Sequence, residues 1–130
     1  DRHLLQKADL ATPHIAGFSA DGKANGTRAS LEHIGRFFGQ TVEKIGAVAP
    51  PPPAEPVIDL DCFASHRIGH ALLRAFDPRP VDRALRESPE QFEALRTHYR
   101  HPREYGAYAI RHATGAEAAI LREIGFRIEN

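Results

Sequence analysis

Histidine is the side chain in this sequence best suited to proton transfer near neutral pH, and His14 has the most site-like surroundings. It lies in the stretch ATPHIAGFSADGKANGT, residues 11–27, directly after Pro13. Proline restricts the preceding residue to an extended conformation and suits a strand end, and Gly17 then allows a sharp turn. The pattern predicts a histidine at the carboxyl end of a strand, where open α/β sheets bind ligands. A lone histidine among apolar residues is also typical of a structural group, so both interpretations stay open.

The other histidines give weaker indications of a site. His66 and His70 are four residues apart in HRIGH, a spacing that places both on one face of a helix. A zinc protease would need glutamate at the position of Arg67, and Arg74 follows on the same face. Because two cations oppose a bound metal ion, we interpret this pair as a solvated face and predict no metal site. His112 has no ligand-like neighbours in the sequence.

No other motif completes a catalytic or cofactor site. Cys62 has no second cysteine as a partner, and the neighbouring Asp61 carboxylate disfavours a reactive thiolate. We therefore interpret Cys62 as a packing residue at a helix start. The sequence holds no Gly-x-Gly-x-x-Gly or Walker-type loop, so no nucleotide site is complete within it.

Charge and composition exclude several classes of function. Lys+Arg and Asp+Glu both number 17, so the excess of positive charge that supports non-specific nucleic-acid binding is missing. The apolar runs fall far short of the roughly 20 residues that span a bilayer. A single cysteine favours a reducing compartment, and we expect a cytoplasmic protein. Because the sequence contains no methionine, we also expect a fragment of a longer protein.

A proline-rich stretch divides the sequence into two pieces. Residues 47–56, AVAPPPPAEP, hold five prolines and favour an extended polyproline II spacer. A stiff connector explains this composition better than an SH3-type ligand does. The sequence therefore predicts an N-terminal piece over 1–46, a linker over 47–56 and a C-terminal piece over 57–130.

The N-terminal piece is predicted to hold one strand, residues 10–17, and one helix, residues 21–38. Ser19 or Asp21 can cap this helix. One strand and one helix bury too little surface to offset their conformational entropy, so they must pack on something else. Three glycines in the helix indicate either a close backbone approach or a later helix start near Thr27. These glycines are Gly22, Gly26 and Gly35.

The C-terminal piece is predicted to be a complete small unit of helices and strands. Its two capping signals are Ser88 with Gln91, and Thr114 with Glu117. The predicted strands cover 57–61, 104–112 and 126–130, and the predicted helices cover 62–76, a segment after Ser88 and a segment from Thr114 to Gly125. We therefore predict an α+β fold with a small antiparallel or mixed sheet.

Two parts of the sequence resemble a known enzyme superfamily. TPHIAG, followed by a helix start with glycine and lysine, is similar to the catalytic-histidine segment of the NAD-dependent D-2-hydroxyacid dehydrogenases. The longer stretch HIAGFSADGKANGT resembles a narrower family among them, the erythronate-4-phosphate dehydrogenases. The tail segments FDPRPVDRALRES, FEALRTHYRHPREY and ILREIGF resemble the C-terminal dimerisation domain of that family. The resemblance covers essentially all 130 residues.

The resemblance implies a fold and a reaction. Residues 1–46 would be a strand and helix left over from a Rossmann-type NAD-binding domain, and residues 57–130 would form a homodimer. The family oxidises 4-phospho-D-erythronate to 2-oxo-3-hydroxy-4-phosphobutanoate with NAD, in the biosynthesis of pyridoxal phosphate (vitamin B6).

The resemblance also assigns roles to three residues. His14 would be the proton donor and acceptor, a task that imidazole suits. Gly17 would lie near the cofactor, where a side chain would obstruct close approach. Phe18 would lie near the substrate, at a position where the family usually has a tyrosine, so the hydroxyl donor is missing here. The family's orienting carboxylate, its substrate-binding arginine and its dinucleotide loop come before this segment, so we expect the chain alone to be inactive.

Two other interpretations remain open. The C-terminal piece could be an autonomous homodimerisation module without a catalytic role. The chain could also be the tail of another D-2-hydroxyacid dehydrogenase, because the residues that select the substrate are not in this sequence.

Overall fold

The computed structural model of the protein describes residues 2–40 and 48–129. Its helices are α1 (Arg2–Lys7), α2 (Ala20–Phe37), α3 (Arg67–Ala75), α4 (Arg79–Glu87), α5 (Phe92–Thr97) and α6 (Gly115–Ile124). Its strands are β1 (Val57–Asp59), β2 (Ala109–Arg111) and β3 (Arg127–Ile128), and short 3-10 turns cover Leu60–Cys62, Pro89–Gln91 and Tyr105–Ala107. Residues 41–47, where the predicted boundary between the N-terminal piece and the linker falls, lie outside the described residues. The domain division therefore stays a prediction.

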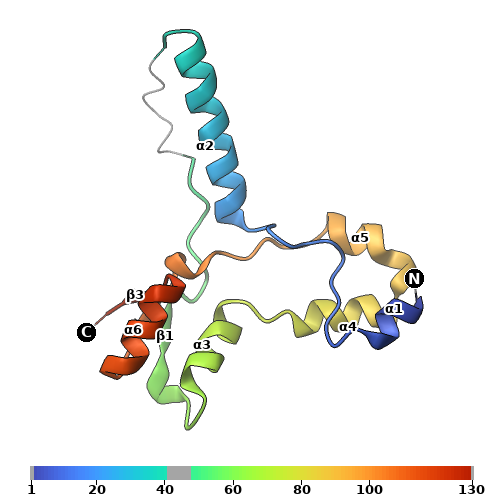
Figure 1. The fold of residues 1–130 in the computed structure, drawn as a ribbon, viewed down its shortest axis with the longest axis vertical. Helices are drawn as coiled ribbons and strands as arrows, with labels where there is room; N and C mark the ends of the chain where they lie inside the picture. Colours follow the sequence, from blue (N-terminus) through green and yellow to red (C-terminus); the bar gives the residue numbers. More distant parts are fainter. Residues whose placement is uncertain (1, 41–47, 130) are drawn as a thin grey trace.

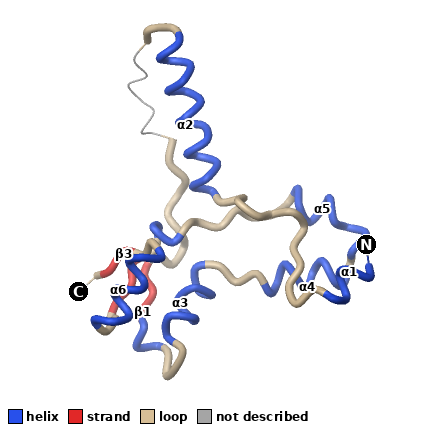
Figure 2. Tube along the Cα trace, in the orientation of Figure 1, coloured by secondary structure: helices blue, strands red, loops and turns tan. Residues whose placement is uncertain are grey.

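The elements form three groups in space (Figures 1 and 2). The strands lie together with α3 and α6, and α1 lies with α4 and α5 in a second group. Helix α2 projects away from both groups, so much of its apolar stripe is uncovered. Phe37 and Phe38 at the far end of α2 are 83% and 68% exposed.

The sheet has the order β1-β2-β3, and both neighbouring pairs are parallel. Ile110 at the centre of β2 is in register with Ile58 on one side and Ile128 on the other. Parallel strands need a crossover that carries the chain back to the same edge, and α6 forms the crossover between β2 and β3. The predicted α+β fold is confirmed, but the strands are parallel and not antiparallel, because helical crossovers and not hairpins connect them.

One hydrophobic core lies between the sheet and the helices α3 and α6. It consists of Ile58, Leu60, Ala71, Ala75, Tyr108, Ile110, Leu121 and Phe126. The hydroxyl of Tyr108 donates a hydrogen bond to the Ala75 carbonyl at 3.2 Å, which satisfies the polar end of this buried ring. All eight residues belong to the predicted C-terminal piece, which therefore has a core of its own.

The strand predicted over residues 10–17 is wrong, because this segment forms a loop. His14 has a left-handed backbone conformation with φ of 57°, which interrupts an extended chain. Local turns take the place of a sheet ladder. The N–H of His14 donates to the Thr12 carbonyl at 2.9 Å, and the N–H of Phe18 donates to the Ile15 carbonyl at 3.0 Å.

Helix α2 confirms the helix predicted after this loop and begins at Ala20, so the alternative start near Thr27 is wrong. Ser19 is its N-cap and accepts a hydrogen bond from the Gly22 N–H at 2.8 Å. A Cβ atom built on Gly22 would lie 2.9 Å from the Ser19 hydroxyl oxygen. Glycine at this position therefore leaves room for the cap, whereas a Cβ atom built on Gly26 would meet no described atom within 4 Å.

The helix predicted over 62–76 is shorter in the structure and begins at Arg67. His66 precedes it with φ of 50°, a left-handed conformation that an α-helix cannot include. Cys62 lies in a 3-10 turn and is exposed, so its interpretation as a packing residue at a helix start is wrong.

Two further elements differ from the prediction. Helix α4 was not among the predicted elements. Its proline lies in the first turn, where no helical hydrogen bond is lost. The strand predicted over 104–112 begins with a 3-10 turn, so β2 covers only its later part. Tyr108, Ala109 and Ile110 are all buried. None of the described helices is long and apolar enough to cross a membrane.

Candidate functional site

His14 lies on the loop between α1 and α2, exposed between two buried neighbours. Pro13 and Ile15 anchor the loop on either side, and Ile15 is only 6% exposed. Within the described residues, the His14 imidazole makes no hydrogen bond or ion pair. The imidazole is thus presented at the surface, and the described part of the chain does not supply a carboxylate to orient it.

Gly17 forms the turn that follows His14. Its φ of 77° lies in the left-handed region that glycine adopts without strain, which confirms the predicted sharp turn. The N–H of Ser19 donates to the Gly17 carbonyl at 3.0 Å and closes the turn against the start of α2. No described atom lies within 4 Å of a Cβ atom built on Gly17, so the space beside this turn is open. The cofactor role of Gly17 stays a prediction.

Phe18 lines a mostly apolar cavity of about 790 Å³ between this loop and the C-terminal piece. Gly17 contributes to the same cavity, and the opposite wall includes Tyr99 and Tyr105. The Phe18 ring is half-buried and meets the ring of His101 edge to face, with centroids 6.0 Å apart. The structure therefore brings Gly17 and Phe18 together in one cavity, whereas His14 is not among the residues that line it.

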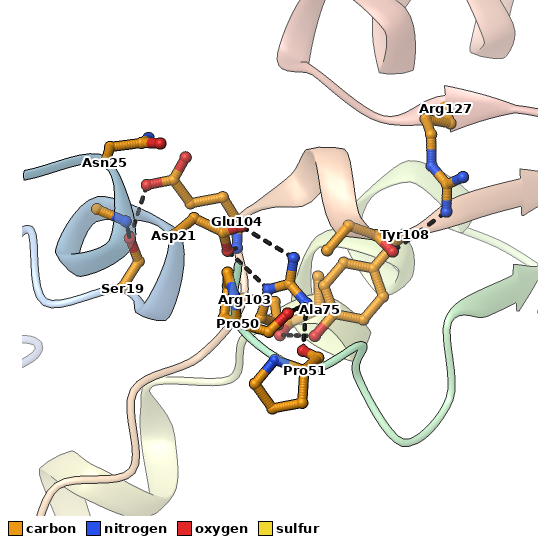
Figure 3. A network of polar contacts seen from close by, with 12 residues as sticks. Ser19, Asp21, Asn25, Pro50, Pro51, Ala75, Arg103, Glu104, Tyr108 and Arg127 are labelled. Atoms are coloured by element: carbon orange, nitrogen blue, oxygen red, sulfur yellow. Dashed lines mark hydrogen bonds and ion pairs between the residues drawn. The ribbon is translucent and has the colours of Figure 1, made fainter. Parts of the chain in front are cut away.

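The first turn of α2 is tied to the connection between α5 and β2 by a polar network (Figure 3). Arg103 donates from Nε and Nη2 to the two carboxylate oxygens of Asp21, each at 2.9 Å. The backbone N–H of Glu104 donates to Asp21 at 2.8 Å, and the Ser19 hydroxyl donates to the Glu104 carboxylate at 2.6 Å. These contacts fix the start of α2 next to the turn at Gly17.

The same network sets the charge states at the cavity wall. The hydrogen bonds from Arg103, followed by the N–H of Glu104, hold the pKa of Asp21 below its ordinary value despite partial burial. Asp21 in turn raises the pKa of Arg103. Arg103 also donates to the Pro51 carbonyl, so it links α2 to the proline-rich stretch. A carboxylate kept ionised in this way is a structural tie rather than a proton carrier.

His112 does have polar partners, which corrects the expectation from its sequence neighbours. Its Nδ1 lies 2.7 Å from Asp59 Oδ1 and 3.5 Å from Asp61 Oδ2. The hydrogen bond to Asp59 and the charges of both carboxylates raise the pKa of His112, and His112 lowers the pKa of Asp59. Arg67 lies 3.5 Å from Asp61 and donates to the His112 carbonyl. The group is a network of charge pairs at the carboxyl ends of β1 and β2.

The ligand atoms of Asp59, Asp61 and His112 lie within 4.8 Å of one another, a spacing that a metal ion could use. His112 Nδ1 and the neighbouring Arg67 already pair with these carboxylates, so their contacts account for the cluster without an ion. His66 and His70 are both exposed, but His66 precedes α3 with a left-handed backbone, so the prediction that the two lie on one helix face is wrong. The His70 ring stacks on Phe63 with centroids 4.9 Å apart.

Sequence reasoning missed the residues that form the far wall of the cavity. Arg103 and Glu104 follow the helix stop in RHPREY, where charged residues flanked by aromatic ones were the only signal. Nothing in that stretch indicates its partner, because Asp21 is 82 residues away in the sequence.

The described residues do not fit a complete NAD molecule. The diphosphate of a dinucleotide is normally held by a glycine-rich loop at a helix N-terminus or by cations. Arg103 is the one cation among the described residues that line the cavity. Its guanidinium already donates hydrogen bonds to Asp21 and to the Pro51 carbonyl of the proline-rich stretch. This chain can thus contribute only an edge of such a site.

Comparison with known proteins shows what this chain is similar to. Residues 50–125 match a family described as "Domain of unknown function (DUF3410)". The chain is 55% identical over 126 residues to erythronate-4-phosphate dehydrogenase from Porphyromonas gingivalis, which covers 97% of the chain and 34% of that relative. It is 44% identical to the Bacteroides fragilis enzyme, over 85% of the chain and 30% of the relative, and 32% identical to that from Yersinia enterocolitica, over 95% and 34%.

These matches confirm the resemblance to the erythronate-4-phosphate dehydrogenases. The chain spans about a third of the length of these relatives. Because the alignment with the Porphyromonas gingivalis relative covers 97% of the chain, it includes the His14 loop as well as the helices and strands that follow.

Proposed function

This chain belongs to the family described as the domain of unknown function DUF3410, and from that membership we propose that it is the C-terminal part of an NAD-dependent erythronate-4-phosphate dehydrogenase. The observation that carries the proposal is an alignment at 55% identity that covers 97% of the chain and so includes the segment with His14. The reaction is oxidation of 4-phospho-D-erythronate to 2-oxo-3-hydroxy-4-phosphobutanoate, a step toward pyridoxal phosphate. The single cysteine supports a cytoplasmic location for this enzyme.

His14 acts as the proton acceptor in the proposed reaction. Oxidation of a secondary alcohol removes a proton from oxygen and a hydride from carbon, and neutral imidazole accepts the hydroxyl proton at neutral pH. Two features of the structure support this role. The imidazole is exposed, and the buried Pro13 and Ile15 fix the backbone on both sides of it. Gly17 and Phe18, which the resemblance places at cofactor and substrate, line the adjoining cavity.

NAD supplies the hydride acceptor when the complete enzyme binds it. Since the described residues do not fit the whole cofactor, we attribute to this chain the proton transfer and part of the binding wall, and we expect it to be inactive on its own. Phe18 contributes apolar contact without a hydroxyl donor.

The test is steady-state oxidation by the intact polypeptide that contains this segment. His14→Asn removes the proton acceptor and should lower kcat by about 10²- to 10⁴-fold, the range typical of a lost general base. His33→Asn is the matched control, because His33 is an exposed histidine on α2 outside the cavity. Full activity of His14→Asn would contradict the proposal. A preference for an unphosphorylated 2-hydroxy acid over 4-phospho-D-erythronate would instead identify another D-2-hydroxyacid dehydrogenase.

We also propose that residues 57–130 mediate homodimerisation of this enzyme. Two observations support this second function. The strands of this piece and its helices α3 and α6 share a hydrophobic core made only of residues from this piece. The piece nevertheless leaves Ile120 on α6 46% exposed and Leu73 on α3 36% exposed, which offers apolar surface to a second copy.

A further inference from the structure

Arg86, near the end of α4, binds the backbone that leads into the His14 loop. Its Nη1 donates to the Leu5 carbonyl and its Nη2 donates to the Ala8 carbonyl, each at 2.6 Å. Both carbonyls lie at the end of α1, where a helix leaves its last carbonyls without partners. A guanidinium can satisfy two of them at once because its donors form a rigid fork. Arg86 therefore holds the end of α1 against α4.

Asp82 lies one turn earlier on α4 and extends this hold toward His14. Its Oδ1 accepts a hydrogen bond from the Ala11 N–H at 2.7 Å, and both carboxylate oxygens lie 2.9 Å from Arg86 Nε. The two side chains are only 17% and 32% exposed. Arg86 thus orients the carboxylate that binds Ala11, and Asp82 orients the guanidinium that binds α1.

The loop that carries His14 is consequently held at both ends. Thr12 and Pro13 alone separate His14 from the anchored Ala11. On the other side, the Ala20 N–H donates to the Pro102 carbonyl at 2.9 Å, next to the network around Arg103. The groups that hold the loop come from residues 50–125, the part of the chain that matches the family of unknown function.

We infer that Asp82 and Arg86 are positioning residues for His14, and that one role of the DUF3410 domain is to set the place of this imidazole relative to the substrate. Neither residue touches the cavity, so each acts through the backbone of residues 5–11. The inference rests on the proposed function of His14 and adds the elements that hold it. A misplacement of a catalytic group by about 1 Å can cost on the order of 10²-fold in rate, so such anchors affect turnover strongly.

The first experiment measures the anchor itself in this 130-residue chain. Amide hydrogen exchange of Ala11, followed by NMR, reports the hydrogen bond to Asp82 directly. In Arg86→Met the carboxylate loses its orienting partner, and we expect exchange at Ala11 to accelerate at least about tenfold. Arg83→Met is the matched control, because Arg83 is an exposed arginine on the same helix. Unchanged exchange at Ala11 in Arg86→Met would overturn the inference.

The second experiment measures turnover in the intact polypeptide. Arg86→Met should lower kcat by about 10- to 100-fold with little change in the KM for NAD, because the anchor acts on the proton acceptor and not on cofactor binding. Arg86→Lys keeps the charge but loses the fork, so it should restore part of the lost kcat. A merely structural role would instead lower the amount of folded enzyme and leave the kcat of the folded fraction unchanged. That outcome would also overturn the inference.

Asp82→Asn keeps the inference testable if Arg86→Met does not fold. This variant retains an oxygen that can accept from Ala11 but loses the charge that binds Arg86, so its exchange rate and kcat should be intermediate. Failure of the proposed function is distinguishable from failure of this inference. If the His14→Asn enzyme is fully active, the proposed function of His14 is contradicted whatever the result for Arg86. If His14→Asn is inactive and Arg86→Met is fully active, only the positioning role is contradicted.

Discussion

At the scale of single residues, three histidines share an uncommon backbone conformation. His14, His66 and His112 are the non-glycine residues with positive φ in the described ranges 2–40 and 48–129. Each ends or precedes a regular element or forms a turn, and histidine tolerates the left-handed region better than a β-branched residue does. The conformation thus places each imidazole where the chain changes direction, beside rather than within an element.

His112 provides a prediction about pH. Its pKa is raised by Asp59 and Asp61, so the protonated form is favoured in the folded chain. While Asp59 remains ionised, the pair therefore stabilises the fold fully below pH 6.5, the ordinary pKa of histidine, and this stabilisation is lost as the pH rises through the higher pKa of the folded state. We expect NMR titration to show that His112 titrates above 6.5 and that Asp59→Asn lowers its pKa.

Asp77→Asn is the control for this titration, because Asp77 pairs with Arg79 and not with a histidine. This variant should leave the titration of His112 unchanged. An Asp59→Asn chain in which His112 still titrates at its original pKa would show that Asp59 is not the dominant partner.

At the scale of elements, caps decide where several helices start, and the two capping signals in the C-terminal piece behave differently. Thr114 forms the predicted capping box: its hydroxyl accepts from the Glu117 N–H at 3.4 Å, and the Glu117 carboxylate accepts from the Thr114 N–H at 2.8 Å. Ser88 makes no side-chain hydrogen bond of this kind, and a 3-10 turn over Pro89–Gln91 follows it. The same motif therefore caps α6 at Thr114, whereas at Ser88 it only precedes a 3-10 turn.

This difference predicts unequal effects of two similar substitutions. Thr114→Ala removes a cap that holds α6, and it should lower the free energy of unfolding by about 1 kcal/mol, within the usual range of about 0.5–2 kcal/mol. Ser88→Ala removes no such bond and should have a much smaller effect. Urea unfolding followed by circular dichroism compares the two. Equal losses in both variants would mean that the capping box does not stabilise α6.

The helices around the candidate site differ in how they are held. Helix α2 is fixed at its first turn by Ser19, Asp21 and their partners, whereas its far end carries the exposed Phe37. Helix α1 is short and depends on Arg86 for its last carbonyls. The loop with His14 thus obtains its position from two anchored ends rather than from its own sequence.

At the scale of the whole molecule, the proposed dimer can be tested against the exposed apolar surfaces. If residues 57–130 mediate dimerisation, sedimentation velocity should show a dimer whose population rises with concentration, and Ile120→Lys should shift it toward the monomer because a charge on an apolar interface is costly. Phe37→Lys is the control, since Phe37 is exposed on α2 outside this piece. A dimer that Phe37→Lys abolishes and Ile120→Lys does not would place the interface on α2 instead.

Much of the local structure could be predicted from the sequence. The Thr114 cap, the glycine turn at Gly17, the N-cap of α2 and the end of α6 at Gly125 were all expected, and the structure confirms them. Each depends on groups no more than a few residues apart, so the short stretch of sequence contains both partners of the interaction. The family resemblance, which rests on such short stretches, was confirmed as well.

The arrangement around His14 depends on contacts that no short stretch contains. Asp21 and Arg103 are 82 residues apart, Arg86 and Leu5 are 81 apart, and His112 and Asp59 are 53 apart. The sequence offers 17 acidic side chains as possible partners for Arg103 or His112. Which of them each residue contacts follows from how the elements pack. The failed strand over residues 10–17 has the same cause, because a strand forms only where a neighbouring strand supplies its hydrogen bonds. Residue types along the chain thus led to the prediction of a proton-transfer role for His14, while packing between distant segments set where the imidazole lies and what holds it there.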